Sequence, residues 1–340
     1  MIKEKVIKTI KDYKLIEDGD KIVLGVSGGP DSISMLNILN DIRNENLIKF
    51  DMVVAHIHHG LRENAYLDEK YVENFCGKLN IPFYVLHANV REQAQKEKKG
   101  LEETGREVRY QFFNQVLEKE KANKIAIAHN NNDSVETVLM NLIRGSGISG
   151  LKGIEPKIGI YIRPLIQIER ADIELYCKEK RLNPRHDESN DENIYTRNKM
   201  RNIVIPYIQK ELNPNILKTI TRLSEIADEE VKYINKQAEK AYIDICIEEN
   251  IFEENVYNKE NKSTIILDLK KFNSQEKLIQ KKVILLSINK LFGTTNGIEK
   301  IHIEDMIKLC NKNIGNKFLI PNKKMKIVIK NKKIYLMSQI

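Results

Sequence analysis

The chain has 340 residues, 41% of them hydrophobic and 31% charged, and this length predicts about two domains that can each bury a core. No apolar run approaches the ~20 residues that span a bilayer, and the amino terminus mixes lysines with apolar residues at helical spacing, which excludes a secretory signal. The formal net charge of +8 fits a nucleic-acid partner without requiring one. We therefore expect a cytoplasmic protein with no membrane partner.

The first half of the chain alternates short apolar runs with helical patterns. The apolar runs, each unbroken, are Lys21–Val26, Asp51–Ile57, Pro82–His87 and Lys124–His129. Helical periodicity follows them at 32–44, 64–79, 101–119 and 133–144. Unbroken apolar runs are typical of strands covered on both faces, so this order predicts an α/β fold with a parallel sheet and helices on both faces.

Reactive side chains follow several of these predicted strands, where each strand ends. They are Ser27, His56, His58, His87, His129 and Asp133. Ligands bind beyond the carboxyl ends of parallel strands, although a single histidine there is usually structural. Because several such residues meet at the edge that also carries a glycine turn, we expect the functional site at this edge.

The second half of the chain has a different texture. After a glycine-rich loop near 145–159, apolar residues recur every three or four positions from Ile216 to Ile245, which predicts one helix of about 30 residues. Lysines alternate with β-branched residues in Phe318–Met337, which suggests a short hairpin with one basic face. We place a boundary near residue 212, between a catalytic domain, 1–212, and a mainly helical, lysine-rich domain, 213–340.

The segment KIVLGVSGGPDSISML, Lys21–Leu36, has the pattern of a strand, a tight turn and a helix. Its two adjacent glycines let the backbone approach an anion, and the positive end of the helix would face that anion. The lysine of the common phosphate loop, GxxxxGK[ST], is missing. Asp31 would repel a phosphate directly, so it either caps the helix or holds Mg²⁺ between its carboxylate and the phosphate. An ordinary strand-to-helix turn is the alternative.

The motif SGGPDS after a buried strand resembles the pyrophosphate loop of the ATP pyrophosphatases, the PP-loop or adenine nucleotide alpha hydrolase-like superfamily. These enzymes cleave ATP between the α and β phosphates and adenylate an oxygen atom of their substrate. The resemblance implies that the turn holds the departing pyrophosphate, for which no lysine is needed. It also implies ATP and Mg²⁺ as cofactors.

Five further motifs follow in order and are similar to those of the tRNA(Ile)-lysidine synthetase family. They are His56–Ala65, Leu101–Phe113, Ala128–Gly153, Ile162–Ile166 and His186–Pro206. The resemblance implies a carbon–nitrogen ligase that joins free L-lysine to C2 of the wobble cytidine in the CAU anticodon of tRNA(Ile). The tRNA is first adenylated, and AMP and pyrophosphate are released. Members often carry a further carboxyl-terminal domain, which no segment of this sequence resembles.

Position and resemblance together assign the nucleotide to the turn and its neighbours. The ATP-binding candidates are Ser27, Gly28, Gly29, Pro30, Asp31, Ser32, Ala55, His56, Arg106 and Arg109. Asp31 is also the catalytic and magnesium candidate. Arg106 and Arg109 are three apart on one helical face, where they either neutralise phosphate charge or form a solvated basic surface.

Two acidic residues are the candidates for catalysis and for binding the lysine amine. Asp133 and Glu136 lie three apart at the start of a helix whose other face is apolar, so both carboxylates should point toward the sheet edge. Asn132, where the family commonly has aspartate, can still contact an amine or a metal through its carbonyl but carries less charge. The alternative is an acidic pair that only stabilises the helix amino terminus.

Arg197 and Arg201 are four apart, and so on one helical face, and are the candidates for binding tRNA. Asp187, Ser189 and Asn190 either position the cytidine or cap that helix. The lysines of the second domain would add salt-sensitive affinity for tRNA rather than sequence recognition.

Two other functions fit parts of the sequence. A tRNA cytidine thiolase of the same superfamily would adenylate the same carbonyl, but such enzymes carry paired cysteines. The cysteines of this chain lie far apart and form no metal-ligand motif: Cys76, Cys177, Cys246 and Cys310. A non-catalytic tRNA-binding protein with a relict nucleotide loop is disfavoured by the intact acidic residues. The sequence leaves a homodimer open.

Overall fold

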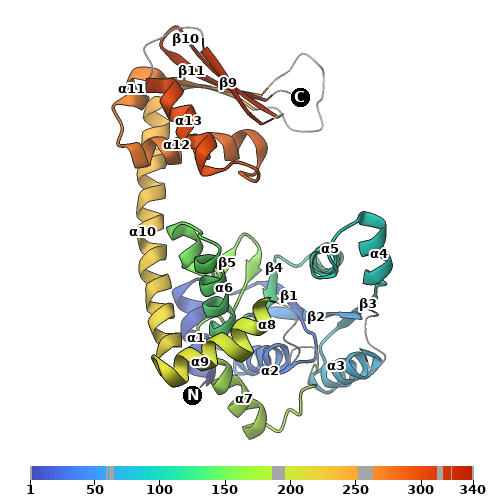
Figure 1. The fold of residues 1–340 in the computed structure, drawn as a ribbon. Helices are drawn as coiled ribbons and strands as arrows, with labels where there is room; N and C mark the ends of the chain where they lie inside the picture. Colours follow the sequence, from blue (N-terminus) through green and yellow to red (C-terminus); the bar gives the residue numbers. More distant parts are fainter. Residues whose placement is uncertain are drawn as a thin grey trace. The chain divides into compact units, whose positions relative to one another are not determined.

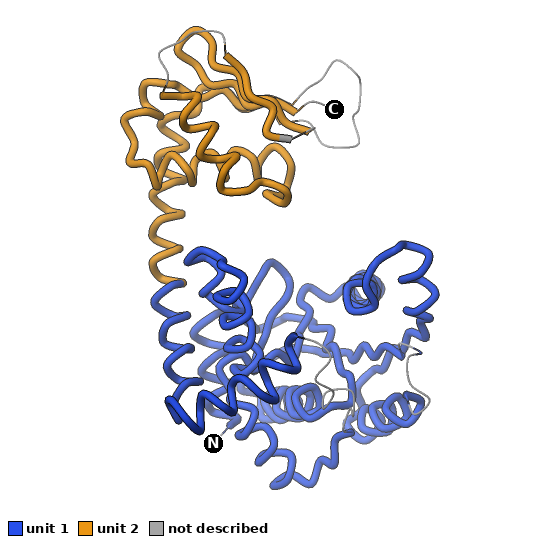
Figure 2. Tube along the Cα trace, viewed as in Figure 1, with its two compact units in different colours: residues 1–227 blue, residues 228–340 orange. Residues whose placement is uncertain are grey.

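The computed structural model describes residues 2–58, 60, 65–185, 196–251, 263–311, 317–322 and 324–338. The chain divides into two compact units, 1–227 and 228–340 (Figure 2). Each unit packs around a hydrophobic core of its own. Within the described ranges, no helix combines the length and the apolar character that crossing a bilayer requires.

A six-stranded sheet forms the centre of unit 1 (Figure 1). Its strands in spatial order are β3 (Phe83–His87), β2 (Asp51–His58), β1 (Lys21–Gly25), β4 (Lys124–Ile127), β6 (Tyr161–Ile162) and β5 (Lys157–Ile158). Neighbouring strands are parallel except in the edge pair of β6 and β5. The four apolar runs are therefore the four main strands, and the predicted parallel α/β fold is confirmed.

Helices cover both faces of this sheet. One face carries α1 (Ile2–Asp12), α2 (Pro30–Asn44), α3 (Ala65–Leu79) and α7 (Arg170–Glu179), and the other carries α5 (Leu101–Glu120). In the central strand, Ile22 and Leu24 pack with the first group, whereas Val23 packs against α5. Successive residues of one strand thus enter different cores, which is why the apolar runs are unbroken.

The close approach of α5 to β1 depends on Gly25, the last residue of that strand. A Cβ atom at this position would lie 2.5 Å from Cζ of Phe113, which is 4% exposed. We expect Gly25→Ala to destabilise unit 1 by about 1–3 kcal/mol, because the buried ring would have to move. Urea unfolding measures this loss, and adding Phe113→Leu should recover much of it. Wild-type stability of the single variant would show that α5 shifts without cost.

A second layer of helices packs on α6 (Asn131–Ile143). It consists of α8 (Thr196–Lys199), the π-helical turn η3 (Met200–Val204), α9 (Ile205–Glu211) and the start of α10 (Ile216–Ile245). Val135 and Val138 of α6 share an apolar cluster with Ile220 of α10. The first turns of α10 therefore belong to unit 1, and the chain divides after Ala227 rather than near residue 212.

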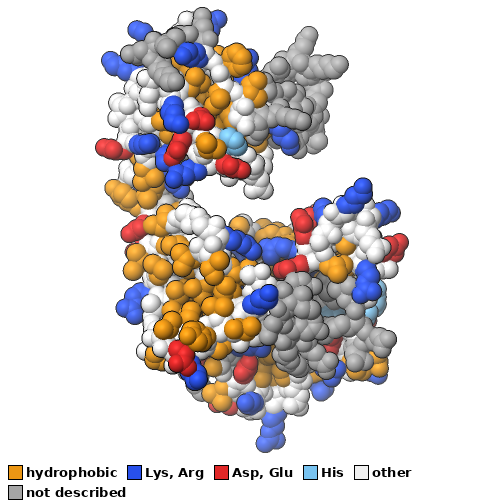
Figure 3. All heavy atoms as spheres, viewed as in Figure 1, with side chains coloured by type: hydrophobic (Ala, Val, Ile, Leu, Met, Phe, Trp, Pro, Cys, Tyr) orange, Lys and Arg blue, Asp and Glu red, His pale blue; other side chains and the backbone are white. Residues whose placement is uncertain are grey.

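The outer surface of this helical layer is apolar. Leu142, Ile143, Ile203 and Tyr207 are each more than half exposed, and Figure 3 shows apolar side chains gathered over α6, α8 and α9. A contiguous exposed patch of this kind is typical of an interaction surface.

Unit 2 combines an antiparallel sheet with helices. Its strands in spatial order are β7 (Cys246–Asn250), β8 (Thr264–Asp268), β11 (Lys333–Ser338), β10 (Met325–Lys330) and β9 (Lys317–Asn322). Helices α11 (Leu269–Asn273), α12 (Lys277–Phe292) and α13 (Lys300–Asn311) share one core with the sheet. The hairpin predicted near the carboxyl end is formed by β10 and β11. The domain expected to be mainly helical thus also contains a five-stranded sheet, in which β7 and β8 were not anticipated from the sequence.

Candidate active site

The turn between β1 and α2 is organised by Ser32. Its hydroxyl accepts hydrogen bonds from the backbone N–H groups of Ser27 and Gly28, both at 3.2 Å, and donates to the carbonyl of Gly29 at 3.1 Å. Gly28 has a φ of +95°, which favours glycine. Within the described residues, α2 begins after Gly29 without a side-chain cap, so the N–H groups of its first turn are available to an anion. Asp31 is therefore not the cap of this helix, one of the two roles that its position allowed.

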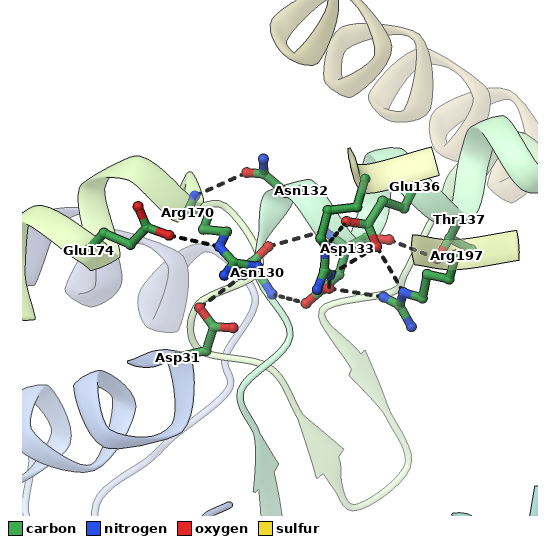
Figure 4. Close-up of polar contacts among 10 residues, drawn as sticks. Asp31, Asn130, Asn132, Asp133, Glu136, Thr137, Arg170, Glu174 and Arg197 are labelled. Carbon is green, nitrogen blue, oxygen red and sulfur yellow. Dashed lines mark hydrogen bonds and ion pairs between the residues drawn. The ribbon is translucent and has the colours of Figure 1, made fainter. Parts of the chain in front are cut away.

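The Asp31 carboxylate is directed toward the start of α6 (Figure 4). Its Oδ1 accepts a hydrogen bond from Nδ2 of Asn130 at 3.1 Å. Burial, together with the nearby charge of Asp133, raises the pKa of Asp31 to about 6. A half-buried carboxylate beside a second one gains from binding a cation, so Asp31 is suited to hold a metal ion.

A capping box starts α6. Asn130 Oδ1 accepts a hydrogen bond from the backbone N–H of Asp133 at 3.1 Å, and Asp133 Oδ2 accepts one from the backbone N–H of Asn130 at 3.0 Å. One oxygen of Asp133 thus serves the helix terminus, the role that the sequence left open as the alternative. The other oxygen, Oδ1, accepts hydrogen bonds from two arginines instead.

Arg197, shown in Figure 4, and Arg201 both donate hydrogen bonds to the two acidic residues of α6. Arg197 Nε donates to Glu136 Oε2 at 2.8 Å, and Arg201 Nε donates to Glu136 Oε1 at 2.7 Å. Their Nη2 atoms donate to Asp133 Oδ1 at 3.0 and 2.9 Å. Glu136 is only 1% exposed. The two carboxylates and the two guanidinium groups therefore form a cluster with no net charge. The arginines predicted to bind tRNA are thus paired with the carboxylates predicted to bind the lysine amine.

His129 follows β4 at the same sheet edge and is held by Arg163, a residue that the sequence analysis did not single out. Arg163 donates from Nε to His129 Nδ1 at 3.2 Å and from Nη1 to the carbonyl of Glu155 at 2.7 Å. Because a guanidinium group can only donate, the imidazole is neutral and carries its proton on Nε2. Burial also lowers the pKa of His129 to about 4. His129 is thus a fixed hydrogen-bond donor at neutral pH. The only sequence signal for Arg163 was its place within the motif Ile162–Ile166.

Three further candidates support the site from its sides. His56, 3% exposed, donates from Nδ1 to the carbonyl of Val26 at 2.8 Å and so braces the turn. The side chain of Ala55 is fully buried in the core beneath α5. Asn132 Oδ1 accepts a hydrogen bond from the backbone N–H of Arg170 at 3.0 Å, which ties α6 to α7.

Arg106 and Arg109 lie on α5 and are both exposed. The Arg106 guanidinium lies 4.9 Å from the centre of the Tyr110 ring, and its charge lowers the pKa of His129 as a minor contribution after burial. Arg106 is thus near enough to the sheet edge to act on it electrostatically. Three candidates lie outside the described residues: Asp187, Ser189 and Asn190.

The residues present fit a magnesium ion that arrives with a nucleotide. In the part of the chain that the structure describes, no group of three acidic, histidine or cysteine side chains could enclose a metal. Mg²⁺, however, is usually held by one or two carboxylates, waters and the phosphates of the substrate. Asp31, at the start of α2, supplies such a carboxylate beside the N–H groups that would hold the phosphates.

Comparison with known proteins places this site in context. The PP-loop domain family matches residues 2–208. A tRNA(Ile)-lysidine synthase of Caldanaerobacter subterraneus is 39% identical over 94% of this chain and 65% of the relative. A tRNA(Ile)-lysidine synthase of Clostridioides difficile is 38% identical over 98% of this chain and 71% of the relative. The chain thus spans about two thirds of the length of the curated relatives that it matches.

A solved structure supports the fold alone. The U34-tRNA thiolase NcsA from Methanococcus maripaludis, with its [4Fe-4S] cluster, superposes with a TM-score of 0.54 at 23% identity, over 67% of this chain and 78% of that one. At this identity the match shows a shared fold and nothing about the chemistry.

Proposed function

The chain belongs to the tRNA(Ile)-lysidine synthase family of PP-loop proteins, and we propose that it ligates free L-lysine to C2 of the wobble cytidine in the CAU anticodon of tRNA(Ile). ATP supplies the energy, and AMP and pyrophosphate are the products. The observation that carries this proposal is the hydrogen bond from Asn130 to Asp31. It joins the turn between β1 and α2, here called the pyrophosphate turn, to the helix of Asp133 and Glu136. The proposed nucleotide site and the proposed amine site thus lie at the same edge of the sheet.

In the first step, the cytidine C2 oxygen attacks the α phosphorus of ATP, and the bond between the α phosphorus and the bridging oxygen to the β phosphate breaks. Pyrophosphate leaves with the electron pair of that bond. The N–H groups at the start of α2 would hold the departing anion. Asp31 would hold the magnesium ion, which neutralises phosphate charge when bound. The His129 Nε2 proton offers a further hydrogen bond to an oxygen at this edge.

In the second step, the lysine amine attacks C2, the bond from C2 to the AMP oxygen breaks, and AMP leaves with the electron pair. The amine must first lose a proton, and a carboxylate of Asp133 or Glu136 would accept it. Free lysine carries both ammonium and carboxylate groups. Its carboxylate can pair with Arg197 while one of its two ammonium groups takes the released carboxylate oxygen, so the ion pairs of α6 are exchanged for new ion pairs of the same kind.

The pH dependence of nucleotide binding tests the role of Asp31. Its pKa of about 6 means that the carboxylate is protonated as the pH falls through that value. Binding of ATP with Mg²⁺ should then weaken by up to about tenfold per pH unit below this range. The affinity for ATP without metal should stay the same or increase as the pH falls, because a negative charge facing the phosphates is lost. Calorimetric titration with Mg²⁺ and with a chelator measures the two affinities. If both affinities changed with pH by the same slope, Asp31 would not be the metal ligand.

We infer that the outer face of the sheet in unit 2 contacts the tRNA. In β10, Met325, Ile327 and Ile329 are buried, which turns the alternate residues Lys326 and Lys330 outward. Beside them, Phe318 of β9 is 60% exposed, and the centre of its ring lies 4.6 Å from Nζ of Lys326. Lysines interleaved with an exposed aromatic ring suit the phosphates and bases of RNA.

On the neighbouring strand β11, Lys333 pairs with Lys330 and precedes the buried Ile334, so it lies on the same face. Replacing Lys326, Lys330 and Lys333 together with glutamine should weaken tRNA binding in a salt-dependent way. Three lost phosphate contacts would flatten the slope of log affinity against log salt by about 2 units, and ATP binding should not change. The matched control neutralises Lys290, Lys300 and Lys308 of α12 and α13. An equal effect of both triple variants would show that net charge alone, rather than this face, binds the tRNA.

The decisive experiment supplies ATP, labelled lysine and a tRNA(Ile) with a CAU anticodon, followed by nucleoside analysis. We expect labelled lysidine together with AMP and pyrophosphate, and release of ADP and orthophosphate would contradict the proposal. A thiolase would transfer sulfur, but Cys76, Cys177 and Cys310 are buried and free of disulfides. A relict protein would bind tRNA without releasing pyrophosphate. The proposed location of this reaction is the cytoplasm, and a homodimer stays a prediction.

A further inference from the structure

Asn130 is a buried side chain that joins the two halves of the proposed site. It follows His129 at the carboxyl end of β4 and is 1% exposed. Its side-chain carbonyl caps α6 by accepting the N–H of Asp133 at 3.1 Å. Its side-chain amino group donates to Asp31 Oδ1 at 3.1 Å. One planar amide therefore connects the helix of the pyrophosphate turn with the helix of the acidic pair (Figure 4).

The orientation of this amide is forced by its surroundings. A backbone N–H can only donate, so the oxygen of the Asn130 side chain must face Asp133, and the amino group must face Asp31. Serine, aspartate and asparagine cap helices about equally well. Of these three, only asparagine has an acceptor oxygen for the cap and a separate nitrogen that can donate on the far side, whereas the donor and acceptor of serine are the same oxygen atom. The residue at this position thus does more than capping requires.

We propose that Asn130 is a positioning residue that fixes the Asp31 carboxylate for magnesium-bound ATP and sets its place relative to Asp133. This inference rests on the proposed function. The amino group occupies one carboxylate oxygen and leaves the other for the metal ion. Because the same amide is anchored to the first turn of α6, the two reaction steps are carried out on elements held in a fixed relation.

Substitutions at Asn130 can separate this role from helix capping. Asn130→Ser keeps an oxygen that can cap α6 but removes the donor to Asp31. Asn130→Asp also keeps a cap but turns a negative charge toward Asp31. The matched control is Asn89→Ser, because Asn89 caps α4 (Val90–Glu97) by accepting the N–H of Glu92 at 3.2 Å.

The experiment measures equilibrium binding of ATP to the full chain, with Mg²⁺ and with a chelator, beside thermal unfolding. Asn130→Ser should weaken binding of magnesium-bound ATP by about 10- to 100-fold, as loss of a partner of a metal ligand typically does. Binding of metal-free ATP and the unfolding temperature should stay close to wild type. Asn130→Asp should lose at least as much affinity, and Asn89→Ser should lose none.

The proposal fails if Asn130→Ser binds magnesium-bound ATP like the wild type. It also fails if binding with and without metal weakens equally while the unfolding temperature drops, since capping alone would explain that result. No tRNA or lysine enters the assay, so a wild-type protein that binds magnesium-bound ATP but makes no lysidine would overturn the proposed function without affecting this test. A wild-type protein that binds no ATP would overturn both.

Discussion

Replacing Asp31 with alanine should reduce ATP-dependent pyrophosphate release by about a thousandfold or more, while tRNA affinity stays nearly unchanged. Asp31 lies in the first turn of α2, beside the N–H groups proposed to hold pyrophosphate, and one of its oxygens is already fixed by Asn130. Its loss would leave the metal ion without a protein carboxylate. The tRNA contacts proposed for unit 2 involve other residues. Pyrophosphate release and filter binding of tRNA measure the two effects separately.

The matched control for this variant is Asp172→Ala. Asp172 is an acidic residue in the first turn of α7, and its carboxylate accepts a hydrogen bond from Nζ of Lys5 at 2.6 Å. The Asp172→Ala variant should release pyrophosphate at the wild-type rate, because this exposed ion pair lies outside the proposed site. Pyrophosphate release that survives Asp31→Ala would remove Asp31 from the mechanism.

The fold of unit 1 was predictable because its strands carry a local signal. Ile22, Val23 and Leu24 enter cores on two faces, so the run has no polar interruption, and such runs are recognisable in a sequence. The boundary of the units was less predictable. The periodic pattern of α10 shows one helix, but it does not show that Ile220 packs on α6. Packing partners, rather than periodicity, decide to which unit a long helix belongs.

The spacing of several candidate residues predicted which of them share a helical face, but the contacts between those faces were not predictable. The spacing of Asp133 and Glu136 predicted a shared helical face, and the spacing of Arg197 and Arg201 predicted another. That these two faces meet depends on the fold between them. The hydrogen bond from Asn130 to Asp31 likewise spans 99 residues. Three consecutive asparagines gave no local reason to separate Asn130, which holds Asp31, from Asn132, which ties α6 to α7.

The substitution Glu136→Gln should impair the use of lysine far more than it impairs adenylation. The variant keeps the shape of the side chain but removes a buried charge that pairs with Arg197 and Arg201. We expect the lysine-dependent step to slow by about a hundredfold or more, because the ammonium loses its carboxylate partner. Transfer of labelled AMP to tRNA without lysine measures adenylation, and lysine incorporation measures the second step. Equal loss of both steps would contradict the assignment.

Stability must be separated from chemistry in this variant, since Glu136→Gln leaves two guanidinium groups with one buried carboxylate. That imbalance should cost about 3–5 kcal/mol of unfolding free energy. Adding Arg201→Gln restores a neutral cluster and should recover much of the stability, as measured by urea unfolding. Lysine incorporation should remain low in the double variant, because Glu136 is still absent. If incorporation returned together with stability, the carboxylate would serve only to hold the arginines, and the amine would need another binding site.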